Sequence, residues 1–385
     1  MLYNRSITAS DHAFFLFGPR GTGKTTWLQT AYPHAHVVDL LPHRVTMEYV
    51  KNPSLLEKEI LSLPKNTWVV IDEIQKVPAL LDEVHALIEN HGYKRFVLTG
   101  SSARKLRRQS GTNLLAGRAH VRHLFPLTLN EMNGDVPLNQ ILEFGCLPTS
   151  ITARNAADRK EYLQSYLDTY LREEIRQEGL VRKLDSFARF LEVAGLAGGQ
   201  VVNVGGLASD AGIGRNSARG FFSLLEDTLI GNWLPAYRPR AKIKERAHPK
   251  FYWFDVGVFN AICGGLSHAL AADWKGHAIE TWLFMELTAY LHYTRRGGSL
   301  SYWATPTGGE VDFVWNDGRR VVCIEAKAST SFRNNFCKGI DSFAQGAKVS
   351  GAWVVYLGEK ILKQGSAHIV PATAFIKKLY AGEVL

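Results

Sequence analysis

The stretch that decides the fold is residues 13–25, which reads AFFLFGPRGTGKT. Its first five residues are all apolar, as is typical of a buried strand in a parallel sheet. The next eight residues, Gly18 to Thr25, satisfy the pattern G-x-x-x-x-G-K-[ST] at every required position. Glycines let successive backbone N–H groups surround a phosphate, and the helix that follows adds the positive end of its dipole. The stretch therefore predicts a strand, a loop and a helix that together bind a nucleoside triphosphate.

The residue types in this loop also predict the cofactors, ATP and Mg²⁺. Lys24 is expected to reach the β- and γ-phosphates, and the Thr25 hydroxyl is expected to ligate magnesium. The predicted nucleotide-binding residues are Gly18, Pro19, Arg20, Gly21, Thr22, Gly23, Lys24, Thr25 and Thr26.

A second apolar run, TWVVI at 67–71, leads directly into Asp72 and Glu73. Adjacent carboxylates at a strand tip are typical of a Walker B motif, in which Asp72 holds magnesium and Glu73 polarises the attacking water. An acidic pair after a strand can also cap a helix, but the loop upstream favours the catalytic interpretation. Another strand is expected over 95–99, and Ser101 beyond it is predicted to hydrogen-bond the γ-phosphate or the water.

These motifs, with Leu98–Ser102, Ala116–Arg118 and Pro126-Leu127, resemble the AAA-family (AAA+) P-loop ATPases of a bacterial and archaeal group. The resemblance implies ATP hydrolysis at subunit interfaces of a homo-oligomer, with a hexamer favoured, where a neighbour's arginine completes the site. Arg118 is the first candidate for that arginine and Arg104 is the second. The basic run at 104–108 is either a solvated surface or a contact with a subunit or nucleic acid.

Composition limits the class of protein. The 385 residues are 46% hydrophobic and 21% charged, which favours a folded globular protein of two or three domains. No apolar run approaches the roughly 18 residues of a membrane span. The four cysteines form no C-x-x-C pair, and the first residues lack the long apolar segment of a signal peptide. Both observations favour a reducing cytoplasm. The net charge of +9 favours a polyanionic partner.

The middle of the chain predicts a helical lid and then a winged helix. A stripe of apolar residues with helical spacing runs from Ala157 to Ile175, and three further helices are expected between Phe187 and Asp227. On the third of these helices, Arg215, Asn216 and Arg219 are candidate DNA contacts. The basic segment 237–250 would be a wing, in which Lys242 and Lys244 are further candidates and Lys250 is the last cation. Winged helices in ATPases also serve as contacts between subunits.

The last part of the chain predicts a second chemical site. A helix over 275–291 contains Glu280, and three strands are expected over 300–304, 310–315 and 320–326. A tight turn at Asp317-Gly318 predicts that Asp312 lies opposite Cys323 and Glu310 opposite Glu325, with Asp312, Glu325 and Lys327 on one face.

This set, Glu280, Asp312, Glu325 and Lys327, resembles the PD-(D/E)xK nucleases. In that superfamily the carboxylates bind magnesium and the lysine activates water or stabilises the phosphorane charge. Some such domains are retained only for binding.

The sequence thus predicts an α/β protein with four parts. They are a P-loop AAA+ core with a parallel sheet (1–135), a helical lid (136–182), a winged helix (183–248) and a restriction-endonuclease-like α/β domain (249–385). The leading hypothesis is an oligomeric ATPase that acts on DNA in repair, recombination or mobile-element defence. The alternative is a nucleotide-switched signalling or toxin-regulating protein whose C-terminal domain binds a protein partner.

Overall fold

The computed structural model describes residues 3–100, 115, 117–171, 184–238, 248–266, 272–305 and 308–385. The chain divides into two compact units. We call Arg5–Pro126 with Asp227–Leu229 the N-terminal unit, and Met1–Asn4, Leu127–Glu226 and Ile230–Leu385 the C-terminal unit. No helix within the described ranges combines the length and the apolar character that crossing a membrane requires.

The N-terminal unit is a parallel α/β sheet, as the apolar runs of the sequence predict. Its elements are β1 Phe14–Phe17, α1 Lys24–Ala31, β2 His36–Asp39, α2 His43–Lys51, α3 Leu55–Ser62, β3 Val69–Asp72, η1 Ile74–Lys76, α4 Leu80–His91, β4 Phe96–Gly100 and β5 His120–His123. The described strands pair in the order β2-β3-β4-β1-β5, and every pairing is parallel. The strand that carries Asp72 therefore lies next to β4, in agreement with the sequence-based prediction.

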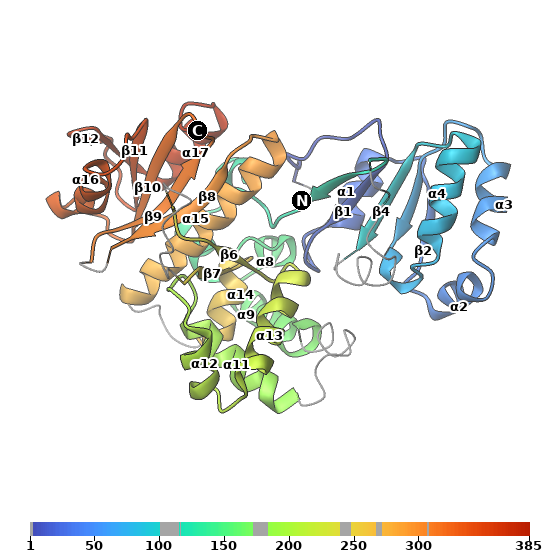
Figure 1. Cartoon of the computed structure of the whole chain (residues 1–385), viewed down its shortest axis with the longest axis horizontal. Coiled ribbons are helices and arrows are strands. Elements are labelled where there is room, and N and C mark those ends of the chain that lie inside the picture. Colours follow the sequence, from blue (N-terminus) through green and yellow to red (C-terminus); the bar gives the residue numbers. More distant parts are fainter. Residues whose placement is uncertain are drawn as a thin grey trace. The chain divides into compact units, whose positions relative to one another are not determined.

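Both faces of this sheet are covered, which is why its strands are apolar at successive positions. Phe15 belongs to a core cluster with residues of α2, α3 and α4, including Tyr49, Ile60 and Leu87. Phe14, which points the other way, contacts the ring of Trp27 on α1. The helices α1 and α4 are labelled on the blue and cyan part of the ribbon in Figure 1.

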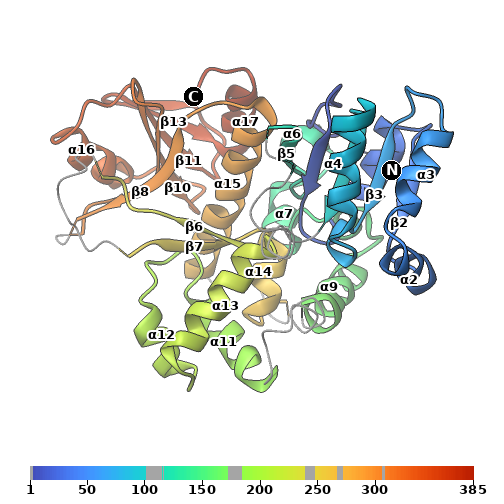
Figure 2. The ribbon, with the colours of Figure 1, turned by 45° about the vertical axis from the view of Figure 1, so that its right-hand side comes forward.

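The C-terminal unit begins with helices. They are α6 Leu129–Met132, α7 Leu138–Phe144, α8 Pro148–Thr152, α9 Ala156–Ser165 and the π-helix η2 Tyr166–Leu171, followed by α11 Leu184–Leu196, α12 Val204–Asp210 and α13 Arg215–Asp227. Two antiparallel strands come next, β6 Gly231–Leu234 and β7 Lys250–Trp253. The views in Figures 1 and 2 agree that α11, α12 and α13 lie together beside this pair of strands. Phe222 of α13 packs against Trp233 of β6 and Phe251 of β7.

The rest of the C-terminal unit is a mixed sheet with helices on both faces. Its elements are α14 Val256–Ile262, α15 Ala272–Thr294, β8 Ser299–Ala304, β9 Glu310–Asn316, β10 Val321–Lys327, η3 Asn334–Cys337, α16 Lys338–Ala344, β11 Gly351–Tyr356, β12 Leu362–Gln364, β13 Ala367–Pro371 and α17 Ala372–Tyr380. The described strands pair in the order β12-β13-β11-β10-β9-β8. Cys323 and Val354 of the sheet pack with Ile340 of α16 on one face. On the other face, Phe313 contacts Phe284 of α15 and Trp353 contacts Phe375 of α17.

The predicted register between β9 and β10 was wrong by two residues. Asn316 pairs with Val321, and Cys323 pairs with Val314 instead of Asp312. The reason is a longer turn than the sequence predicted. The Asp317 carboxylate accepts the N–H groups of Arg319 at 2.9 Å and Arg320 at 2.7 Å, so these residues stay in the loop. Asp and Asn side chains commonly compete with strand pairing in this way.

Candidate functional site

In the N-terminal unit, Lys24 bonds back to the loop 18–25, the phosphate loop that the sequence predicts. The Lys24 ammonium donates hydrogen bonds to the carbonyl oxygens of Gly18 at 2.7 Å and Pro19 at 3.3 Å. Gly23, immediately before α1, has φ 89°, a conformation that an L side chain rarely adopts. The Lys24 ammonium is thus held by the loop residues that the sequence predicts to surround the phosphates.

The two predicted magnesium ligands lie side by side. The Thr25 hydroxyl donates to a carboxylate oxygen of Asp72 at 3.3 Å, although the two residues are 47 positions apart in the chain. Parallel strands bring their carboxyl ends to one edge of the sheet, and both residues follow or end such a strand. Hydroxyl and carboxylate oxygens are ligands that Mg²⁺ prefers, so the residues present fit this ion.

Thr99 is a site residue that the sequence-based reasoning missed. It ends the apolar run of β4, its hydroxyl donates to the Asp72 carboxylate, and it accepts the backbone N–H of Glu73 at 3.2 Å. Thr99 is fully buried. The signal was available, since Thr99 is the polar residue inside the strand next to Asp72, two positions before the predicted Ser101. Ser101 and Arg104 lie outside the described residues.

Glu73 and Arg118, two other predicted catalytic residues, each contact a neighbouring side chain. Gln75 donates to the Glu73 carboxylate, and Glu73 itself has φ 60°, a left-handed conformation that is uncommon for glutamate. Arg118 donates to Glu89 of α4, and its side chain is 34% exposed. That contact lies within one chain.

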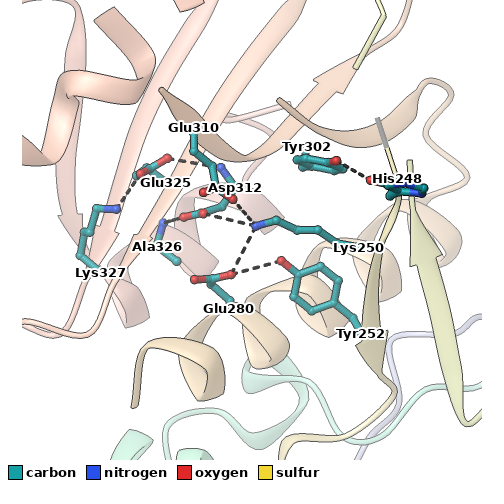
Figure 3. A network of polar contacts seen from close by, with 10 residues as sticks. All are labelled: His248, Lys250, Tyr252, Glu280, Tyr302, Glu310, Asp312, Glu325, Ala326 and Lys327. Carbon is teal, nitrogen blue, oxygen red and sulfur yellow. Dashed lines mark hydrogen bonds and ion pairs between the residues drawn. The ribbon is translucent and has the colours of Figure 1, made fainter. Parts of the chain in front are cut away.

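The four predicted nuclease-like residues line one pocket of the C-terminal unit. Its volume is about 490 Å³, and its lining includes Glu280, Asp312, Glu325 and Lys327. Figure 3 shows these side chains pointing toward one another from α15, β9 and β10. Lys338 and Gly339 of α16 also line the pocket. A Cβ at Gly339 would collide with the carbonyl oxygen of Glu310, so glycine is needed for α16 to approach β9 here.

Asp312 and Glu325 come together where the regular pairing of β9 and β10 ends. The last residue pair of this ladder is Ile324 with Phe313. Beyond it, the Ala326 N–H donates to the Asp312 carboxylate at 2.8 Å, and the Asp312 N–H donates to the Glu325 carboxylate at 3.3 Å. The Lys327 ammonium donates to the other oxygen of Glu325 at 2.6 Å. The convergence thus depends on side-chain to backbone hydrogen bonds as well as on strand alternation.

Lys250 completes this group, whereas the sequence predicts it as the last cation of a basic wing that contacts DNA. That assignment was wrong for Lys250, which is only 3% exposed. Its ammonium lies 2.5 Å from a Glu310 carboxylate oxygen, 3.8 Å from Glu280 and 4.0 Å from Asp312. Lys242 and Lys244 of the same segment lie outside the described residues.

Burial and the charge of a neighbouring carboxylate raise the pKa values of Glu280 and Glu325 in this pocket. For Glu280, desolvation and then the charge of Asp312 raise the pKa, against the opposing effect of Lys250. For Glu325, desolvation and Asp312 raise the pKa, and Lys327 opposes them. Desolvation alone would lower the pKa of Lys250, but Asp312, Glu280 and Glu310 outweigh it and raise that pKa. Lys250 therefore stays protonated.

The carboxylates of this pocket do not fit a metal ion as they are arranged. Among the described residues, no group of three or more His, Cys, Asp or Glu side chains is placed to hold one. The oxygens of Glu280, Glu310 and Asp312 are directed at the Lys250 ammonium instead. No catalytic step through a metal follows from this arrangement.

The predicted DNA contacts on α13 are accessible. Arg215, Asn216 and Arg219 are all exposed, whereas Ala218, Phe221 and Phe222 of the same helix are buried. The helix therefore presents cations and an amide to solvent on the face opposite its apolar packing.

Comparisons with known proteins define the class of the N-terminal unit. Residues 10–133 match a family model described as an AAA domain. Together with the parallel sheet and the phosphate loop, this match identifies an AAA-type P-loop domain. Residues 137–268 and 275–375 match two domains of unknown function, DUF8612 and DUF4143.

Two curated relatives extend over most of the chain. They are the uncharacterized proteins Mb2031c of Mycobacterium bovis and Rv2008c of Mycobacterium tuberculosis. Each is 24% identical over 353 residues, which is 89% of this chain and 76% of the relative. The crystal structure of protein VC1899 from Vibrio cholerae aligns over 96% of both chains at 12% identity, but its TM-score of 0.22 is too low to define a shared fold.

Proposed function

We propose that the N-terminal unit binds ATP with Mg²⁺ and hydrolyses it. The observation that carries this proposal is the contact between Thr25 and Asp72 at 3.3 Å, beside the phosphate loop. An anion-binding loop next to a hydroxyl and a carboxylate is the arrangement that phosphoryl transfer requires. The AAA domain match over residues 10–133 supports the same chemistry.

Each residue has a distinct role in this proposal. Lys24 exchanges its bonds with the Gly18 and Pro19 carbonyls for the phosphate oxygens. Thr25 and Asp72 would hold Mg²⁺, which when bound supplies positive charge against the phosphates. Thr99 fixes the Asp72 carboxylate and the backbone of Glu73. Glu73 orients and polarises the attacking water once Gln75 releases its carboxylate.

The test separates binding from chemistry with two variants and two matched controls. Lys24→Ala should weaken ATP binding, because the phosphates lose their main cationic partner. Glu73→Gln should retain ATP binding and slow hydrolysis, because the side chain keeps its size and loses its negative charge. Lys58→Ala and Glu48→Gln, at exposed positions of the same unit, should change neither property. Normal turnover by Glu73→Gln would contradict the assignment of the catalytic base.

We further infer that the active form is an oligomer, with six subunits favoured. Arg118 is exposed and supports this inference, since a cation at the surface can complete a neighbour's site. Its present partner is Glu89, which it would leave on assembly.

A second candidate function is action on DNA by the C-terminal unit. The exposed Arg215, Asn216 and Arg219 of α13 favour it, because such side chains contact phosphates and base edges. Cleavage of DNA by Glu280, Asp312, Glu325 and Lys327 stays a prediction from the PD-(D/E)xK resemblance, and it would require a metal ion to displace Lys250 from Glu280 and Asp312. The alternative remains a nucleotide-switched signalling or toxin-regulating protein, in which this unit binds a protein partner.

A further inference from the structure

Lys250 occupies the centre of a group of carboxylates that come from separate elements. Glu310 and Asp312 belong to β9, Glu280 belongs to α15, and Lys250 belongs to β7. Figure 3 shows the ammonium of Lys250 between these side chains. The Lys250 side chain is 4% exposed, and its ammonium also lies 5.4 Å from the centre of the Tyr302 ring. Water therefore has little access to this cation.

The backbone around Lys250 is fixed on both sides. Lys250 pairs with Leu234 of β6 and forms an isolated antiparallel bridge with Val201. Two residues earlier, the carbonyl of His248 accepts a hydrogen bond from the Tyr302 hydroxyl. These contacts fix the backbone of Lys250, and the fold therefore determines where its side chain enters the pocket.

An ammonium and a divalent cation compete for the same ligands. Both are attracted to carboxylate oxygens, and two cations within about 4 Å of each other repel strongly where water is excluded. The ammonium already has contacts with Glu310 at 2.5 Å, Glu280 at 3.8 Å and Asp312 at 4.0 Å. A metal ion at this place would have to displace it.

We propose that Lys250 is a built-in counter-ion, which takes the place of a divalent cation among Glu280, Glu310 and Asp312 and keeps this pocket formed without metal. Lys250 is a positioning residue in this proposal: it holds three carboxylates in place from a strand that also pairs with β6. The proposal does not depend on ATP hydrolysis, and it opposes metal-dependent cleavage of DNA at this pocket.

The experiment is a titration of the full-length chain with Mn²⁺, without nucleotide, followed by calorimetry. The variant is Lys250→Met, because methionine is unbranched and of similar length but carries no charge. It should gain an Mn²⁺ site with roughly tenfold or higher affinity than the wild type, since a like charge has been removed. The gain should disappear in the double variant Lys250→Met with Asp312→Asn.

Two controls separate the charge at position 250 from the substitution itself. Lys250→Arg retains a cation and should bind Mn²⁺ as weakly as the wild type. Lys348→Met removes a lysine at an exposed position of the same unit and should change nothing. Equal Mn²⁺ affinity of the wild type and Lys250→Met at an Asp312-dependent site would overturn the proposal.

The proposal can still be tested if Lys250→Met fails to fold. Recovery of its folding by Mn²⁺ supports the proposal, because the metal then replaces the missing cation. The Mn²⁺ affinities of the wild type and of its Asp312→Asn variant provide a measurement that does not need Lys250→Met. An Asp312-dependent Mn²⁺ site of micromolar affinity in the wild type would show that Lys250 does not exclude the metal.

Discussion

Glu286 should make the stability of the C-terminal unit fall as the pH rises, which is opposite to the effect of a glutamate in a surface ion pair with a cation. This residue lies on α15, is fully buried, and accepts the Leu129 N–H at 2.7 Å. Burial is the main reason that its pKa rises from the ordinary value of 4.5 to about 8, and Glu131 nearby adds to the rise. The folded protein therefore keeps a proton on Glu286 at neutral pH.

The magnitude follows from linkage between protonation and folding. Between pH 4.5 and about 8, the folded chain binds one proton at Glu286 that the unfolded chain has released. The free energy of unfolding should then fall as the pH rises, by about 1.4 kcal/mol per pH unit. Over this window from 4.5 to about 8, the loss amounts to about 5 kcal/mol. The stabilisation is complete below pH 4.5 and is lost as the pH rises through 8.

The perturbation is Glu286→Gln, which keeps an acceptor for the Leu129 N–H and removes the ionisation. The assay is urea unfolding of both proteins between pH 5 and 9, followed by hydrogen exchange of α15 amides so that the signal comes from the C-terminal unit. Glu286→Gln should be more stable than the wild type above pH 8, with a flatter pH dependence. The exposed Glu359→Gln provides the matched control and should keep the wild-type slope.

Parallel pH profiles of the wild type and Glu286→Gln would refute this reasoning. The carboxyl groups of Asp255, Glu280 and Glu325, whose pKa values are also raised, are present in both proteins, so their effects cancel in the comparison. An equal destabilisation by Glu286→Gln at all pH values would mean that the side chain acts only through its hydrogen bond.

Three further predictions follow from the two units. Thr99→Val should leave ATP binding intact and slow hydrolysis roughly tenfold or more, because Asp72 and Glu73 lose a shared hydrogen-bond partner; a binding and turnover assay checks this, and unchanged turnover would remove Thr99 from the site. A mixture of Lys24→Ala and Arg118→Ala proteins should regain ATPase activity that neither has alone, and a fully active monomer in light scattering would contradict assembly. Arg215→Glu with Arg219→Glu should weaken binding to every DNA duplex and reduce the salt dependence by about two phosphate contacts in gel shifts; unchanged affinity would favour a protein partner for α13.

The local motifs of this chain were predictable because their chemistry depends on neighbouring residues. The phosphate loop from Gly18 to Thr25 and the acidic pair at Asp72 need only a strand before them and a helix or turn after them. The adjacency of β3 and β4 was also predicted, and it is confirmed by the parallel sheet. The AAA domain match agrees with this part of the prediction.

Contacts between distant segments were harder to predict. Lys250 belongs to a run of basic residues in the sequence, and charge runs are usually solvated. Nothing in that run indicates that β7 faces Glu280, 30 positions later, or Glu310 and Asp312 beyond it. The β9–β10 register was missed for a different reason: the Asp317 side chain holds two backbone N–H groups and lengthens the turn.

At the ends of β9 and β10, side-chain carboxylates accept backbone N–H groups in place of carbonyl oxygens. This gives two backbone amides that report whether the pocket is occupied. The amides of Asp312 and Ala326 are protected by the Glu325 and Asp312 side chains, where a regular sheet would use backbone oxygens. Any cation or ligand that draws these carboxylates away leaves both amides without an acceptor, so they should exchange with deuterium faster. Occupancy of the pocket can therefore be followed at two backbone positions, in the native sequence and without a label, even when the ligand itself has no spectroscopic signal.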